Sequence, residues 1–84
     1  MNKVLDAQLY KIEDFGLAVS LKSLGFNLET LDRTNNKRVV FCFKYSLGIE
    51  RIAAQYWKGN LIVNANAFYL NMKALKARLL NDMN

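Results

Sequence analysis

The sequence predicts a small α+β domain in which an antiparallel β-hairpin is covered by three helices, in the order (β)-α-β-β-α-α. The first observation is residues 25–45, where two strand-like runs flank a polar turn and residues 39–43 form the longest unbroken apolar run of the chain. The second is the helical spacing of apolar residues on both sides of this segment. The third is size, because 84 residues, 52% of them hydrophobic, suit one packed domain spanning residues 1–84.

The N-terminal part of the chain contains a possible short strand and the start of the first helix. Residues 7–12 are too short and too polar to form a stable strand alone, but they can pair beside the hairpin as a third strand. Asp14 is placed as an N-cap, since its carboxylate can accept hydrogen bonds from the free N–H groups at a helix start. We expect this helix over residues 15–24. Gly16 lies in the first turn of this helix. It either allows a close approach of another element or has no structural role.

Three leucines predict the core face of the first helix, because Leu17, Leu21 and Leu24 recur at i, i+4 and i+7. Gly25 supplies a left-handed residue that ends the helix. Phe26 is then placed to fold back on Leu21, which is the apolar contact of a Schellman motif. The helix is therefore expected to stop where the hairpin begins.

The two strands of the hairpin differ in how much surface they bury. Residues 26–31 alternate apolar and polar side chains, which predicts a half-buried strand with Phe26 and Leu28 on one face. Residues 38–45 are apolar on much of both faces, which predicts the central strand. The face expected to be buried carries Val39, Phe41, Phe43 and Tyr45. The turn at residues 32–37 is rich in Asp and Asn but has no tight two-residue signal, so we expect a longer loop.

Two more helices are expected after the hairpin. Ser46 is a candidate N-cap for the second helix, and Gly59 closes it. The apolar residues of this helix at helical spacing are Ile49, Ile52, Ala53 and Tyr56. Residues 61–63 read as a short extended connector, and Asn64 then caps a last helix over residues 65–80. The core face of the last helix carries Phe68, Met72, Leu75 and Leu79.

The composition excludes most catalytic chemistry. The chain has no histidine and one cysteine, so it lacks an ordinary acid–base group near neutral pH and a thiolate or imidazole metal site. Cys42 lies inside an apolar strand, where a free cysteine packs as a small hydrophobe. No phosphate-cradling glycine motif is present. We expect a protein that is not an enzyme, with no metal and no cofactor.

The sequence also predicts a cytoplasmic protein that does not enter a membrane. The first residues have no apolar core of signal-peptide length. No run approaches the roughly 20 apolar residues of a membrane-spanning helix. A single cysteine fits a reducing compartment.

Charge is spread unevenly and predicts an anionic partner. Residues 1–32 carry three basic and five acidic side chains, whereas residues 33–81 carry nine basic side chains and one acidic side chain. Such asymmetry is typical of proteins that bind nucleic acid or another polyanion. The candidate binding residues are Arg33, Lys37 and Arg38 at the hairpin turn, Trp57 on the second helix, and Tyr69, Lys73, Lys76 and Arg78 on the last helix.

Each candidate also has a purely structural interpretation. Lysines on the outer face of a terminal helix are often only solvated. The turn arginines can pair with nearby carboxylates, as Asp32–Arg33 and Glu29–Arg38. Trp57 is either exposed and available to stack on a base, or a cap over the core between the second and third helices.

Several short motifs follow one another in an order seen in a known family. They are Tyr10-Lys11-x-x-Asp14, Leu17-Ala18-x-x-Leu21-x-x-x-Gly25-Phe26, Asp32-Arg33, Arg38-Val39-x-Phe41-x-Phe43, Tyr56-Trp57-x-Gly59 and Leu75-Lys76-x-Arg78. The chain resembles, over about residues 10–80, a small family of phage and bacterial proteins known only as a domain of unknown function. The resemblance implies a phage or mobile-element setting and a cytoplasmic protein. It brings no assigned activity.

Two classes of function remain open from the sequence. The first is a nucleic-acid or polyanion binder, which requires the two basic clusters to lie on one continuous surface. The second is a protein- or nucleotide-binding inhibitor of a host defence factor, with or without homo-oligomerisation. It requires an exposed apolar patch around Trp57, Tyr69 and Leu70.

Overall fold

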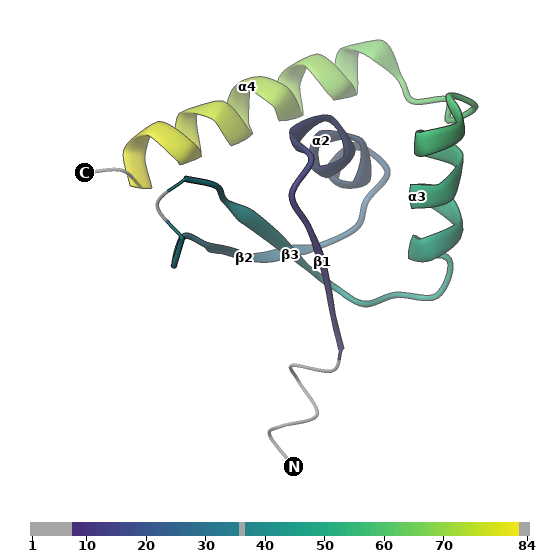
Figure 1. Cartoon of the computed structure of the whole chain (residues 1–84). Helices are drawn as coiled ribbons and strands as arrows, with labels where there is room; N and C mark the ends of the chain where they lie inside the picture. Colours follow the sequence, from purple (N-terminus) through teal and green to yellow (C-terminus); the bar gives the residue numbers. More distant parts are fainter. Residues whose placement is uncertain (1–7, 36, 83–84) are drawn as a thin grey trace.

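The structure is a computed structural model that describes residues 8–35 and 37–82. The charges counted at Lys3 and Asp6, and Asn36 of the predicted turn, lie outside these described residues. The elements in chain order are β1 (Leu9–Ile12), α2 (Phe15–Ser23), β2 (Leu28–Asp32), β3 (Val40–Lys44), α3 (Ile49–Lys58) and α4 (Ala65–Asp82) (Figure 1). This order confirms the predicted α+β class, including the third strand at the N-terminus.

The described elements form a layered arrangement. The antiparallel sheet has the order β1-β3-β2, so β3 is the central strand as predicted. Figure 1 shows α2 lying directly over one face of the sheet, α4 crossing over α2, and α3 standing at the side. None of the described helices covers the other face of the sheet.

The strand register places the aromatic core on the covered face. Phe43 lies opposite Tyr10 on one neighbouring strand and opposite Leu28 on the other. Phe43 and Phe41 are both buried, and the ring of Phe41 lies 6.3 Å from the ring of Phe15 on α2. The prediction was wrong for one outer position of this face: Tyr45 is exposed, because the strand ends at Lys44 before reaching it.

A β-bulge in β2 corrects the predicted alternation of that strand. Leu28 lies opposite Phe43 and Thr30 opposite Cys42, so Glu29 is an extra residue in the ladder. Strict alternation would turn Leu31 away from the core when Leu28 faces it. The extra residue restores Leu31 to the covered face, where it packs against the core.

Helix α2 is buried on every side over five consecutive residues, from Leu17 to Leu21. The prediction of a single buried leucine face was too narrow, because α3 and α4 pack against this helix and it also lies over the sheet. Leu24 is exposed as the C-cap residue, which corrects its predicted place in the core. The predicted Schellman motif is confirmed, since the N–H groups of Phe26 and Gly25 donate to the carbonyls of Leu21 and Lys22, both at 3.0 Å.

The ends of the later helices are partly as expected. The predicted N-cap at Ser46 is wrong, because Gly48 holds that position with a left-handed φ of 92°. The left-handed turn leads the chain into the helix with Ile49 fully buried, while Ser46 only accepts the N–H of Ile49 through its backbone carbonyl. Asn64 caps α4 as predicted, with its side-chain oxygen accepting the N–H of Ala67 at 2.9 Å.

Gly16 marks a close approach of α3 to the start of α2. The Tyr56 hydroxyl donates a 2.6 Å hydrogen bond to Oδ2 of Asp14, and the same oxygen accepts the N–H of Leu17 at 2.9 Å. A Cβ atom at Gly16 would clash with the Tyr56 hydroxyl. The bond to Asp14, together with burial, raises the pKa of Tyr56 to about 12. Asp14 is thus both the predicted N-cap of α2 and the anchor of α3.

Candidate nucleic-acid interface

Arg33, the first candidate of the hairpin turn, holds the end of α4. Its Nη2 donates a 2.7 Å hydrogen bond to the backbone carbonyl of Leu79, and its Nε is buried without a hydrogen-bond partner. The last carbonyls of a helix have no partner within the helix and lie at the negative end of its dipole, so a guanidinium is favoured there. Arg33 therefore joins two elements that are 46 residues apart in the chain.

Arg38, at the other side of the turn, forms an ion pair with Glu13. The distance between its Nη1 and Oε1 of Glu13 is 2.8 Å, and the two side chains are 57% and 51% exposed. The pairs expected from the sequence are wrong. Asp32 accepts hydrogen bonds from the hydroxyl and then the backbone N–H of Thr34, which lower the pKa of Asp32. Glu29 accepts a hydrogen bond from the side chain of Asn27.

The surface beside the turn is mixed in charge. A shallow hollow of about 500 Å³ is lined by Glu13, Asp32, Thr34, Asn35, Arg38 and Val40. Two carboxylates in this hollow oppose the binding of an anion there. Lys37 is exposed at the turn, and its backbone N–H donates to the side chain of Asn35 at 2.8 Å. Within the turn cluster, Arg33 and Arg38 thus already have partners in the fold, and Lys37 and Arg38 are exposed.

The strongest basic feature lies on one flank of α4, which we call the α4 flank and define as Tyr69, Lys73 and Lys76. The Lys73 ammonium lies 5.3 Å from the centre of the Tyr69 ring, and the Tyr69 side chain is 52% exposed. Lys76 is also exposed. At 3.6 residues per turn, Lys76 lies about 20° from Tyr69 around the helix axis, so the three side chains share one side.

Arg78 does not belong to the α4 flank. It lies two residues after Lys76, which places it about 200° around the helix axis from that lysine. The side of α4 that carries Arg78 also carries Asn71, which donates to the hydroxyl of Ser23 on α2 at 3.4 Å. The structure thus separates the basic candidates of α4 into two sides of the helix.

The outer face of α4 is unexpectedly apolar. Leu70 and Leu80 are 54% and 66% exposed, and the exposed residues Ala74 and Ala77 lie between them in the sequence; Leu80 lies about 20° from Tyr69 around the helix axis and so borders the α4 flank. Sequence reasoning named Leu70 but missed Leu80. The signal was present, because adjacent leucines such as Leu79 and Leu80 are about 100° apart on a helix and one of them points away from the core.

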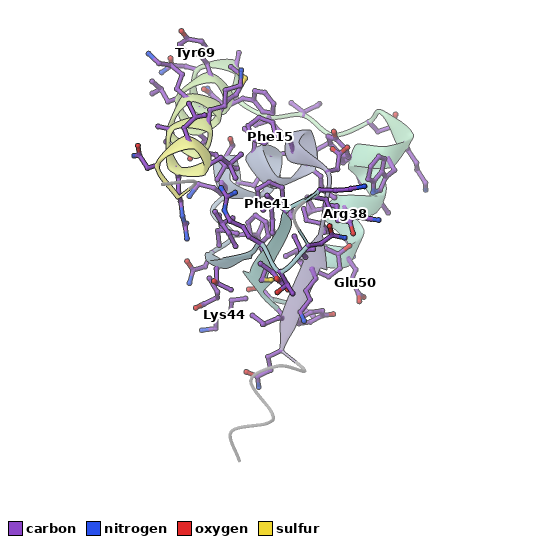
Figure 2. The ribbon with its side chains drawn as sticks, turned by 60° about the vertical axis from the view of Figure 1, so that its left-hand side comes forward. Phe15, Arg38, Phe41, Lys44, Glu50 and Tyr69 are labelled. Carbon is purple, nitrogen blue, oxygen red and sulfur yellow. The ribbon has the colours of Figure 1, made fainter. Side chains whose placement is uncertain are left out.

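Trp57 lies on α3, away from the α4 flank. Its side chain is 63% exposed, and its ring lies edge-on against Tyr56 with a centre-to-centre distance of 4.9 Å. The interpretation that Trp57 covers the core between two helices is therefore wrong. Figure 2 shows Tyr69 on the opposite side of the molecule from α3, so Trp57, Tyr69 and Leu70 do not form the single patch that the protein-binding hypothesis required.

Side chains that could ligate a metal ion do not cluster in the described part of the chain. Within residues 8–35 and 37–82, no group of three His, Cys, Asp or Glu side chains is placed to hold a metal ion. Cys42 is buried, as the sequence predicted, and burial raises the pKa of its thiol. No helix in the described part of the chain has the length and apolar character needed to cross a bilayer.

Comparison with known proteins adds a family and no activity. A family model described as a domain of unknown function (DUF5659) matches residues 7–81. No curated protein and no solved structure matches the chain.

Proposed function

The chain belongs to the DUF5659 family of domains of unknown function, and we propose that it is a non-enzymatic, cytoplasmic protein that binds nucleic acid or another polyanion through α4. The α4 flank supplies the contacts, with Lys73 and Lys76 on phosphates. This proposal keeps the charge argument of the sequence but moves its centre from the hairpin turn to the last helix.

The absence of acidic residues from a long segment carries the proposal. Residues 51–81 contain no Asp or Glu and five basic residues, which are Arg51, Lys58, Lys73, Lys76 and Arg78. No carboxylate in this segment competes with a phosphate for Lys73 and Lys76. Arg33 and Arg38, by contrast, are already engaged with Leu79 and Glu13.

Salt dependence tests the proposal directly. Log affinity should decrease with log salt, and the steepness of this decrease reports the number of phosphate contacts. If Lys73 and Lys76 each contact one phosphate, replacing both by alanine should make the slope for single strands less steep by about 1.4. Single-stranded and duplex probes titrated at several salt concentrations measure this slope. A folded protein that binds neither probe at low salt would exclude the proposal.

A matched control separates the α4 flank from net charge. Lys11→Ala with Lys44→Ala removes the same two charges from exposed positions on the uncovered face of the sheet. This double variant should keep the parental slope within about 0.3, because long-range attraction between exposed charges is screened beyond about 10 Å at ordinary salt. An equal decrease of the slope in the two double variants would show that binding depends on net charge and not on the α4 flank.

The exposed leucines of α4 favour a second candidate function. Leu70 and Leu80 give α4 an apolar outer face, and such faces occur where proteins bind one another. In a phage or mobile-element setting, such a protein would act as an inhibitor that occupies a host factor. Leu70→Lys with Leu80→Lys should abolish capture of that factor, because both changes place a charge on the apolar contact.

A further inference from the structure

We propose that the ligand of α4 is single-stranded nucleic acid, with a base stacked on Tyr69 in the place that Lys73 occupies in the free protein. This inference rests on the proposed function and adds the strandedness of the ligand and the residue that stacks. In the bound state Lys73 leaves the ring and contacts a phosphate, next to Lys76.

The contact between Lys73 and Tyr69 supplies the stacking position. The ammonium lies 5.3 Å from the ring centre, within the range of about 6 Å for a cation–π contact. Such contacts are weak at exposed sites, and the Tyr69 ring is 52% exposed, so a base can displace the lysine. Lys73 keeps its charge in the process and gains a phosphate in exchange for the ring.

The apolar outer face of α4 favours a single strand over a duplex. A duplex presents mainly charged backbone to a helix that lies on its surface, and that backbone gives Leu70 and Leu80 nothing apolar to contact. A single strand exposes base faces, which pack on aromatic and apolar side chains while phosphates reach the basic flank. From Tyr69 to Leu80 the helix rises about 16 Å, which accommodates several nucleotides.

Charge and position argue against the other occupants of this face. A second copy of the chain packed through this segment would offer Lys73 and Lys76 no acidic partner, because residues 51–81 carry no Asp or Glu. Trp57 is a weaker stacking position, since it lies on α3 away from Tyr69 and already contacts Tyr56 (Figure 2). An acidic protein with apolar side chains is the remaining competitor, and it would bind without depending on the strandedness of a nucleic-acid probe.

Dissociation constants of one single-stranded probe and its duplex test the stacking residue. Tyr69→Phe should stay within about twofold of the parent, because it keeps the ring. Tyr69→Ala should weaken single-strand binding by about 5- to 150-fold and leave duplex binding unchanged. Tyr45→Ala is the control, since it removes another exposed tyrosine outside α4.

A double-mutant cycle tests the exchange of Lys73. In the parent a base must displace Lys73 from the ring, whereas in Lys73→Gln the ring is already available. The loss caused by Tyr69→Ala should therefore be larger in the Lys73→Gln background than in the parent. An equal or smaller loss in that background would overturn the exchange.

The outcomes separate this inference from the proposed function. Binding that is independent of Tyr69, or that depends on Trp57 instead, overturns the inference and leaves polyanion binding intact. Duplex binding as tight as single-strand binding also overturns the inference and leaves polyanion binding intact. A folded protein that binds neither form at low salt, but binds an acidic protein through Leu70 and Leu80, overturns both.

Discussion

At the scale of single residues, one part-buried hydroxyl links α3 to α2. The Tyr56 hydroxyl donates to Asp14, and Gly16 leaves room for it because it has no Cβ atom. Asp14 could be predicted as a cap from the sequence, because capping depends on neighbours in the chain. Its bond to Tyr56 could not, because the two residues are 42 positions apart.

Tyr56→Phe should lower the free energy of unfolding by about 1–2 kcal/mol at neutral pH, since a part-buried hydrogen bond to a carboxylate is lost. Urea denaturation measures this difference. A change below about 0.3 kcal/mol would mean that the bond contributes nothing.

The same variant predicts a pH dependence with a defined sign. The pKa of Tyr56 is raised from 10.0 to about 12 in the folded state, so the bond stabilises fully below pH 10 and is lost as the pH rises toward 12. The difference in unfolding free energy between the parent and Tyr56→Phe should therefore shrink across that interval. A difference that stays constant from pH 9 to pH 12 would contradict the assigned cause.

Gly16→Ala should destabilise the protein, although alanine is better than glycine in a helix by about 1 kcal/mol. The new methyl group would displace the Tyr56 hydroxyl from Asp14. In a Tyr56→Phe background the clash is removed, so the same substitution should become neutral or stabilising. Thermal melts of the four proteins in this cycle would show whether the two residues are coupled.

At the scale of elements, the helix ends show what the sequence can predict. The caps at Asp14, Gly25 and Asn64 were confirmed, because each depends on residues within about one turn. The predicted cap at Ser46 was wrong because the backbone turns at Gly48. Burying Ile49 at the helix start contributes more stability than a side-chain cap would. The bulge at Glu29 also depends on pairing with β3, which the local sequence of β2 does not encode.

Arg33→Ala should loosen the last turn of α4 and cost about 1 kcal/mol, because the carbonyl of Leu79 loses its donor. Hydrogen exchange of amides near residues 79–82 should rise while exchange in β3 stays slow. Arg38→Ala is the matched control, and its exposed ion pair with Glu13 should contribute less than about 0.5 kcal/mol. Equal effects of the two variants would remove the distinction between the two arginines.

At the scale of the whole molecule, apolar periodicity predicted the layers, whereas charge did not predict which basic side chains have partners within the fold. Phe41 and Phe43 identified the central strand because burial leaves a pattern in the local sequence. Charge patterns do not reveal partners that arrive from elsewhere in the chain. Arg33 and Arg38 therefore looked available, whereas Leu79 and Glu13 engage them, 46 and 25 residues away.

Phe41→Ala should cost about 3–5 kcal/mol, because it empties a buried aromatic position between the sheet and α2. A chain of 84 residues has a total stability of only about 5–15 kcal/mol, so this loss can unfold it. Val40→Ala, on the uncovered face of the same strand, is the control and should cost less than about 1.5 kcal/mol. A Phe41→Ala protein that melts within two degrees of the parent would contradict the central role of β3.

The burial of helix α2 determines how the protein should respond to cleavage of its backbone. From Leu17 to Leu21 no side faces solvent, so the helix has no stable existence once either the sheet or α4 is removed. Nicking the connector at residues 61–63 should therefore leave no folded fragment, and both pieces should be degraded together. We therefore expect the described elements to fold and unfold as one cooperative unit.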